Sequence, residues 1–186
     1  GQGDVMAGAA ALIARANGLS TKAFNEKLTQ MYVNNETTFG MGVAASALGK
    51  KHASGEWLTD PLLANINKVH VATLPYETKR LTQEIAGGIG ETGCMPSYVD
   101  FNNPTYGHLV QKYLKAASSA ESRAKIARLI EWLTLGAGVP GCMHGGGSPD
   151  GAKIVIRGVA GLDRSIEYAR RLIGLDEAIE EPAAKK

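Results

Sequence analysis

The sequence has 186 residues, of which 44% are hydrophobic and 20% charged, a length and composition that suit one domain with a single buried core. Twenty basic and eighteen acidic side chains leave a formal charge of +2, too balanced to predict a nucleic-acid groove or an anionic membrane surface. No stretch approaches the roughly 20 apolar residues that span a bilayer, and the first residues lack a secretion signal. We therefore expect a cytoplasmic protein whose partners include neither a nucleic acid nor a membrane.

The two cysteines and the first residue carry further expectations. Cys94 and Cys142 lie far apart without CxxC spacing, which argues against a disulfide framework and against a self-contained zinc or iron–sulfur site. We therefore expect no metal site in this chain. The chain starts with Gly1 and an alanine-rich helical pattern follows within a few residues, which favours a fragment, a processed chain or an excised domain.

Apolar residues recur with helical spacing along almost the whole sequence, whereas no alternating pattern lasts long enough to predict a confident strand. The fold class is therefore expected to be all-α, a helix bundle over residues 1–178 followed by a charged tail over residues 179–186. A polar loop at 50–60 and a glycine- and proline-rich loop at 89–103 separate the helical stretches. The expected helices are 4–17, 20–49, 60–88 with a bend near Pro75, 106–116 and 119–135 as an antiparallel pair, and 148–173.

A triple glycine directly before the last helical stretch is the most informative segment for function. Glycines allow a backbone to approach a ligand closely, and the free N–H groups of a helix start favour an anion such as a nucleotide pyrophosphate. Asp150 in the first turn counts against this interpretation, because its carboxylate already satisfies the helix dipole. A tight interhelical turn, with a structural histidine, stays open as the alternative. The candidate cofactor-binding residues are His144, Gly145, Gly146, Gly147 and Ser148.

Two other groups leave alternatives open, and no catalytic residue is assigned. The glycine-rich segment 87–94 superficially resembles a dinucleotide fingerprint, but it follows a helix rather than a strand, so we reject a Rossmann fold. It either lines a pocket or only connects helices. The polar run at 34–37 lies in the middle of a helix, where it faces either a cofactor cavity or solvent.

Five segments, taken in order, cover nearly the whole chain. They are AGAAALIARANG at 7–18, DPLLANINKVHVATLPYETKRLTQEIAGG at 60–88, PSYVDFNNPTYGHLVQKYL at 96–114, RLIEWLTLG at 128–136 and MHGGGSP at 143–149. In these segments the chain resembles the C-terminal part of the family that unites 4-hydroxybutyryl-CoA dehydratase (vinylacetyl-CoA isomerase) with the flavin-dependent 4-hydroxyphenylacetate 3-hydroxylases. The dehydratase branch fits better.

The resemblance implies a C-terminal helical bundle like that of acyl-CoA dehydrogenases, which follows a helical N-terminal domain and a central β domain in the family. It implies that FAD lies between the β domain and the C-terminal helices, near a subunit interface in a tetramer. The loop 145–148 is then expected to contact the flavin nucleotide. The implied partners are the N-terminal and β-domain portion or a partner subunit, further copies in a homo- or hetero-oligomer, and an acyl-CoA or aromatic substrate.

The dehydratase branch also holds a [4Fe-4S] cluster with three cysteines and one histidine. The resemblance places the histidine and the third cysteine around residues 33–41, which contain neither, and residues 140–142 replace an acidic residue of the family. These departures argue against the cluster and against a dehydration that needs it. The expected function is a part, incomplete alone, of a dehydratase-like flavoenzyme. A cluster-free flavin monooxygenase and a non-catalytic assembly module are the alternatives.

Overall fold

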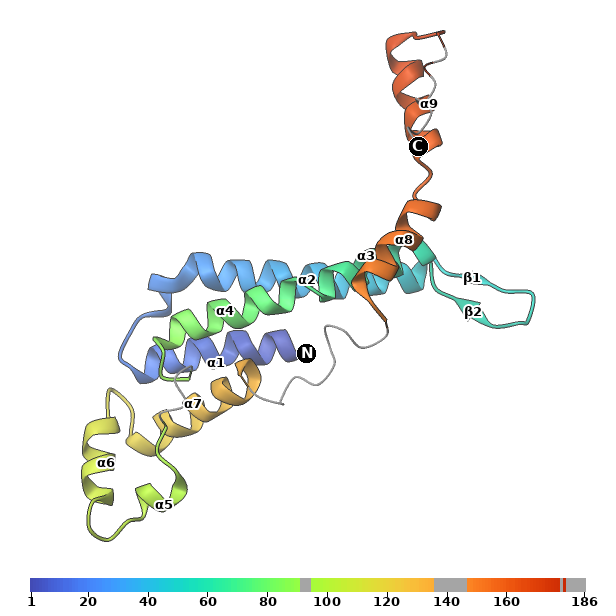
Figure 1. Cartoon of the computed structure of the whole chain (residues 1–186). Helices are drawn as coiled ribbons and strands as arrows, with labels where there is room; N and C mark the ends of the chain where they lie inside the picture. Colours follow the sequence, from blue (N-terminus) through green and yellow to red (C-terminus); the bar gives the residue numbers. More distant parts are fainter. Residues whose placement is uncertain (91–94, 136–146, 178, 180–186) are drawn as a thin grey trace, which may run out of the picture.

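The fold is that of a computed structural model, in which residues 1–90, 95–135, 147–177 and 179 are described (Figure 1). This part of the chain is 71% helical with almost no strand, which confirms the all-α prediction. Within the same ranges, no helix combines the length and apolar composition needed to cross a membrane. The elements are α1 (Gln2–Ala16), the 3₁₀ helix η1 (Thr21–Phe24), α2 (Asn25–Ala47), β1 (Lys50–Lys51), β2 (Trp57–Leu58), α3 (Pro61–Val71), α4 (Leu74–Ala86), α5 (Tyr98–Phe101), α6 (Gly107–Leu114), α7 (Ala120–Thr134), α8 (Pro149–Val159) and α9 (Leu162–Ile173).

Four helices, α1, α2, α4 and α7, form the core of the molecule, and α1 contacts the other three (Figure 1). One side of α1 is rich in buried alanine, which lets neighbouring helices approach closely. Larger apolar side chains from all four helices fill the space between them. The larger core residues are Met6, Ile13, Met31, Leu81, Ile85, Ile130 and Leu133.

Local sequence signals set several helix ends at the predicted positions. At the start of α3, Asp60 Oδ1 accepts a hydrogen bond of 2.8 Å from the Leu63 N–H. At the start of α7, Ser119 Oγ accepts one of 3.2 Å from the Ser122 N–H. Gly87 ends α4 with a φ of +68°, a left-handed conformation that favours glycine. These observations confirm the predicted starts at 60 and 119 and the predicted stop at 87.

The polar loop predicted at 50–60 contains a short antiparallel hairpin. Strands β1 and β2 pair Lys50 with Leu58 and Lys51 with Trp57. Gly49 before the hairpin is buried against the carbonyl of Leu58, which a Cβ atom would approach to 2.5 Å. Strands of two residues are too short for an alternating pattern, so the sequence did not reveal them.

Two other boundaries differ from the prediction. Helix α1 begins at Gln2 rather than Asp4, and the Asp4 carboxylate forms an ion pair with the N-terminal ammonium group. The predicted loop 89–103 contains the one-turn helix α5, which is closed at its start by a reciprocal pair of hydrogen bonds. Ser97 N–H donates to Asp100 Oδ2 at 2.8 Å, and Asp100 N–H donates to Ser97 Oγ at 3.1 Å.

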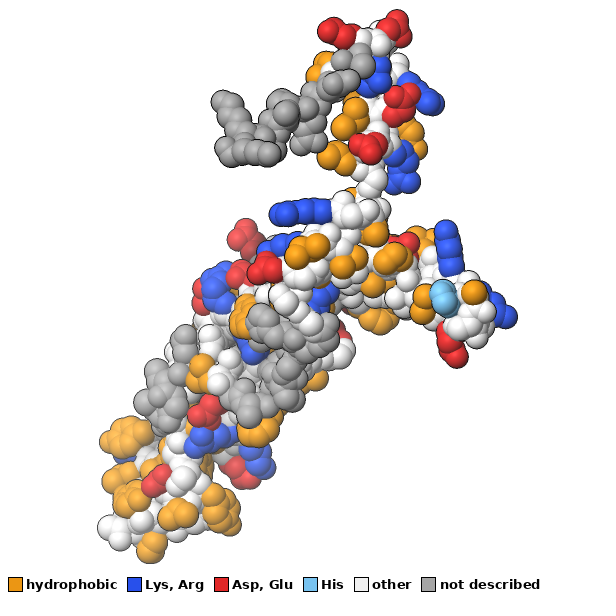
Figure 2. All heavy atoms as spheres, turned by 45° about the vertical axis from the view of Figure 1, so that its right-hand side comes forward, with side chains coloured by type: hydrophobic (Ala, Val, Ile, Leu, Met, Phe, Trp, Pro, Cys, Tyr) orange, Lys and Arg blue, Asp and Glu red, His pale blue; other side chains and the backbone are white. Residues whose placement is uncertain are grey.

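The C-terminal part of α2 extends beyond the four-helix core and packs against α3, which in turn packs against α8 (Figure 1). Within the described residues, α3 contains no buried residue and α8 contains only Ala152. Figure 2 shows apolar side chains at the surface of this distal end, where contiguous apolar patches usually mark contact surfaces. Its exposed large apolar residues include Phe39, Val43, Leu48, Trp57, Leu58, Ile154, Val155 and Val159.

The core packing predicts a large difference between two neighbouring residues of α7. Ile130 is fully buried and Gly90 packs against its side chain, whereas the adjacent Leu129 is 37% exposed. We expect Ile130→Ala to lower the free energy of unfolding by about 2–5 kcal/mol, because it leaves a cavity. Leu129→Ala should lower it by no more than about 1 kcal/mol. Urea unfolding followed by circular dichroism measures both values, and equal losses would contradict the assigned core.

The α5 turn predicts a perturbed tyrosine titration. Tyr106 donates its hydroxyl hydrogen to Asp100 Oδ1 at 2.9 Å, and this hydrogen bond, with burial and the carboxylate charge, raises the pKa of Tyr106. Asp100→Ala should lower that pKa toward the ordinary value of about 10, since the phenolate no longer lies beside a carboxylate. An alkaline ultraviolet titration detects the change. Asp150→Ala is the matched control, and an identical titration in the two variants would refute the contact.

Candidate functional site

A hollow of about 540 Å³ opens at the N-terminal end of α1, the end marked N in Figure 1. The first turn of α1, the middle of α2 and the junction between α3 and α4 form its wall. The apolar side chains of Met6, Phe39, Val71, Leu74 and Pro75 line it together with seven polar side chains from α1, α2 and α4. Small-molecule sites combine apolar walls with polar groups that orient the ligand, so this hollow is the candidate functional site.

Asn34 of α2 is a buried member of the wall with partners inside the protein. Its Oδ1 accepts a hydrogen bond of 2.8 Å from Gln30, and its Nδ2 donates to Thr78 Oγ1 of α4 at 3.4 Å. The Thr38 hydroxyl donates to the Asn34 carbonyl at 3.0 Å. Asn34 and Thr78 are only 3% and 1% exposed, so this pair joins α2 to α4 in the interior. Its role is to hold the wall in place.

Asn35, the next residue of α2, differs because its amide nitrogen is buried without a hydrogen-bond partner among the described residues. Its side chain lies directly over Gly3 of α1, where a Cβ atom would come within 2.0–2.5 Å of the amide group. A buried donor without an acceptor costs about 1–3 kcal/mol. This nitrogen has almost no accessible surface, so an acceptor on a bound molecule would reach it and remove that cost only after the Asn35 side chain turned toward the hollow.

Three residues of the predicted polar run 34–37 lie on the wall of this hollow, whereas Thr37 does not and Glu36 is also exposed to solvent. Asn34, Asn35, Glu36 and Thr38 all line the hollow. The sequence did not reveal Gly3, because nothing in the pattern of α1 distinguishes this glycine from the exposed Gly8. The residues that α3 and α4 contribute were also missed, since only the folded chain brings them beside α2.

A group of ion pairs connects α2 to α4 beside this wall. Lys27 and Arg80 both form ion pairs with Glu84, and Arg80 Nε donates to Glu77 Oε2 at 2.8 Å. The hydrogen bond from Lys27 and the charge of Arg80 lower the pKa of Glu84, and the hydrogen bond from Arg80 lowers that of Glu77. These groups lie at the surface, where ion pairs contribute little to stability. They orient α4 relative to α2 without entering the hollow.

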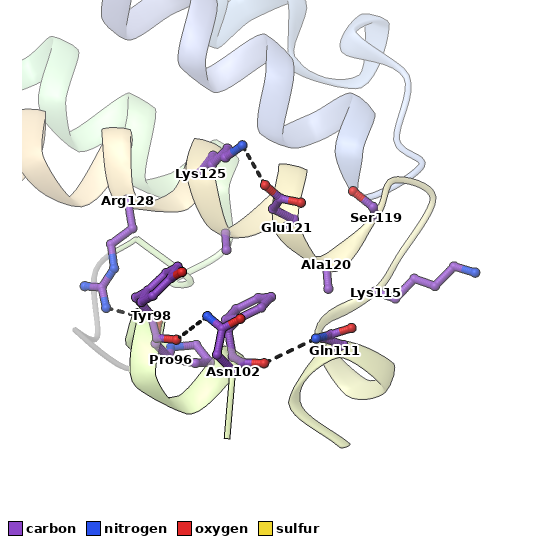
Figure 3. A pocket seen from close by; sticks show the side chains of 12 residues that line it. Pro96, Tyr98, Asn102, Gln111, Lys115, Ser119, Ala120, Glu121, Lys125 and Arg128 are labelled. Atoms are coloured by element: carbon purple, nitrogen blue, oxygen red, sulfur yellow. Dashed lines mark hydrogen bonds and ion pairs between the residues drawn. The ribbon is translucent and has the colours of Figure 1, made fainter. Parts of the chain in front are cut away.

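A larger hollow, of about 930 Å³, lies between α5, α6 and α7, with Lys115 and Arg128 at opposite ends (Figure 3). Most of its polar side chains are already bonded within the protein, so they offer a ligand little. We therefore assign the candidate site to the smaller hollow, which keeps an unpaired donor. The internal contacts are Asn102 to the Tyr98 carbonyl at 2.8 Å, Gln111 to the Phe101 carbonyl at 3.2 Å, Arg128 to the Met95 carbonyl at 2.7 Å, and Lys125 with Glu121 at 2.7 Å.

Only the end of the predicted glycine loop belongs to the described part of the chain. His144, Gly145 and Gly146 lie outside the described residues. Gly147 has a φ of +110°, and Ser148 is the N-cap of α8. Neither Gly147 nor Ser148 lines the hollow beside Asn35. Their contact with a nucleotide stays a prediction.

The start of α8 already has an internal cap. Ser148 Oγ accepts hydrogen bonds from the N–H groups of Asp150 and Gly151 at 3.1 and 3.5 Å. The Asp150 carboxylate binds Lys153 Nζ at 2.9 Å, and that hydrogen bond lowers the pKa of Asp150. Lys153 partly neutralises the negative charge of Asp150, which was the argument against an anion site at the start of α8. Helix α8 packs on α3, whose last residue, Val71, borders the hollow.

Residues suited to a metal do not gather in the described part of the chain. Among residues 1–90, 95–135 and 147–177, no group of three histidine, cysteine, aspartate or glutamate side chains could hold a metal ion. Cys94 and Cys142 lie outside these ranges.

Comparison with known proteins first defines the class. The bundle is the helical part of an acyl-CoA dehydrogenase-like fold. A family model described as the 4-hydroxyphenylacetate 3-hydroxylase C terminal matches residues 1–174. The chain belongs to this family, which confirms the family resemblance seen in the sequence.

Individual relatives cover nearly the whole chain. It is 37% identical over 190 residues to the 4-hydroxybutyryl-CoA dehydratase/vinylacetyl-CoA-Δ-isomerase of Clostridium aminobutyricum, a match that covers 94% of this chain. A solved oxygen-tolerant archaeal 4-hydroxybutyryl-CoA dehydratase from N. maritimus superposes with a TM-score of 0.88 at 39% identity over 99% of the chain. The oxygenase component of 4-hydroxyphenylacetate 3-monooxygenase superposes with a TM-score of 0.78 over 92% of the chain, and its 21% identity supports the fold alone.

The chain is much shorter than these relatives. It spans 38% of the length of each dehydratase and 37% of the oxygenase component. The relatives therefore contain a large portion to which this chain has no counterpart.

The contact between Gly3 and Asn35 predicts opposite effects for two glycines of α1. Gly8 has open space around its Cα, so Gly8→Ala should raise the free energy of unfolding by about 0.5–1 kcal/mol through helix propensity. Gly3→Ala should lower it by about 1–3 kcal/mol, because the new methyl group displaces the Asn35 side chain. Urea unfolding of both variants measures the difference. A stabilised Gly3→Ala variant would show that Asn35 does not lie over Gly3.

Proposed function

We propose that this chain supplies the C-terminal, pocket-forming part of an FAD-dependent enzyme of the 4-hydroxybutyryl-CoA dehydratase type. The observation that carries the proposal is the unpaired amide of Asn35 in the wall of an apolar-lined hollow. Identities of 37% and 39% to two dehydratases favour this branch over the hydroxylase branch, to one solved member of which the chain is 21% identical.

The residues of the hollow fit a flavin ring or an acyl group. Asn35 Nδ2 is a hydrogen-bond donor, and the carbonyl oxygens of a flavin or of an acyl thioester are suitable acceptors. Met6, Phe39 and Leu74 provide apolar walls for a planar ring or an alkyl chain. FAD, when bound, supplies the redox chemistry. The residues of this chain orient the bound group and exclude water from it.

The loop before α8 is the proposed contact for the nucleotide half of FAD. His144, Gly145 and Gly146 lead into Gly147, whose left-handed φ favours glycine although a Cβ atom there would meet no neighbour within 4 Å. A phosphate here would replace Ser148 Oγ as the acceptor for the backbone N–H groups of Asp150 and Gly151. The glycines would keep side chains away from this approach.

A complete pocket needs the portion that the relatives have and this chain does not span. That portion is either part of the same protein or a separate subunit. The exposed apolar side chains around the distal ends of α2 and α8 suit a contact of this kind. The same surface favours the second candidate function, a helical module that serves assembly without catalysis.

The proposed function is tested by flavin binding of the purified protein together with any co-purifying partner. Asn35→Ala should weaken FAD binding about tenfold or more, since an amide–carbonyl hydrogen bond in a buried site is lost. Asn25→Ala, at an exposed amide of the same helix, should leave it unchanged. Quenching of flavin fluorescence measures both affinities.

Two results would count against the proposal. Equal FAD affinity in the two variants would exclude Asn35 from the cofactor contact. A chain that purifies without a partner and stays colourless with added FAD would favour the assembly role.

A further inference from the structure

Helix α9 extends away from the bundle as a separate arm (Figure 1). It runs over 12 residues between two glycines in left-handed conformations, Gly161 with φ of +71° and Gly174 with φ of +62°. No other described helix packs along it. Isolated helices shorter than about 12–15 residues are marginal in water, so α9 needs a contact surface to be a stable helix.

Four apolar residues of α9 follow the spacing of a helix-pairing seam, whereas the exposed Tyr168 and Leu172 lie beside it. Leu162, Ile166, Ala169 and Ile173 are separated by four, three and four residues, which places them on one face. All four are exposed, Leu162 and Ile173 to 69% and 72%. Figure 2 shows apolar side chains along this arm. Within the described part of the chain, no other element therefore packs against this seam.

The charges beside the seam favour a second copy of α9 as the partner. Asp163 lies in the first turn and Arg170 in the last turn, both on the same side of the seam. Asp163 has no ion pair among the described residues, whereas Arg170 lies 3.8 Å from Glu167 of its own helix and donates to the Asp176 carbonyl at 3.1 Å, so a second copy would compete for its charge. Two α9 helices in antiparallel orientation, with Ile166 opposite Ala169 of the other copy, bring Asp163 beside Arg170 twice. The two helix dipoles are then also antiparallel. A parallel pair would instead bring like-charged ends together.

We propose that α9 pairs in antiparallel orientation with α9 of a second copy of this chain, around a two-fold axis. This inference extends the oligomeric assembly that the proposed function implies, and it assigns a specific contact to that assembly. Two short helices bury less surface than the roughly 1,200 Å² of a typical stable interface, so the pair adds to other contacts between copies. The α9 pair determines the register and the antiparallel direction in which the two copies meet.

The test is a charge exchange in the full chain, with mass measured by sedimentation. Asp163→Arg should weaken self-association about tenfold or more, because arginine then lies beside Arg170 of the other copy. Arg170→Asp should do the same. The double variant should restore association, since the pairs form again with opposite polarity. Arg164→Glu, on the outward face of α9, is the control and should associate normally.

The design separates this contact from a loss of helix. Asp163→Arg and Arg170→Asp each place a charge at the unfavourable end of the helix dipole, so circular dichroism of every variant must show unchanged helix content before weaker association is assigned to the contact. Failure of the double variant to recover, or a monomeric wild-type chain, would overturn the proposal. The readout is mass rather than flavin, so its failure leaves the proposed function untouched, and the reverse also holds.

Discussion

The close packing of α1 against α4 and α7 is the contact on which the rest of the structure depends. Ala7, Ala9, Ala10 and Ala14 are each no more than 2% exposed, and their short side chains permit a close approach of the neighbouring helices. Because α1 is held at the centre, its first turn is fixed beside the middle of α2. The hollow opens there, so the candidate site follows directly from the geometry of the core.

Much of this fold could be predicted from local sequence signals. The caps at Asp60 and Ser119 and the stop at Gly87 satisfy backbone groups of their own helices, so neighbours in the sequence suffice to reveal them. The hairpin and α5 were not predicted. The pairing of Lys50 with Leu58 is too short to leave a periodic pattern, and α5 depends on one reciprocal pair of hydrogen bonds inside a region rich in glycine and proline.

The candidate site was predictable only in part. A run of amides in the middle of a helix pointed to Asn35, because buried polar groups need partners. The glycine beneath it and the wall from α3 and α4 depend on contacts between distant residues, which one sequence does not reveal. The loop 144–148 carries a local signal for an anion, but Asp150 counts against it, and the signal alone does not distinguish a cofactor contact from a turn.

The sparse interior of α3 and α8 has a consequence for cooperativity. Many side chains of the four-helix core are buried. In α3 and α8, by contrast, Ala152 is the one buried residue among those described. Amide hydrogens of α3 and α8 should then exchange with solvent through partial opening, while those of α1 exchange only on global unfolding. The hollow touches both regions, through Met6 of α1 and Val71 of α3. A molecule bound in the hollow would join the two regions into one cooperative unit. Its binding would then slow the amide exchange of helices that it does not touch.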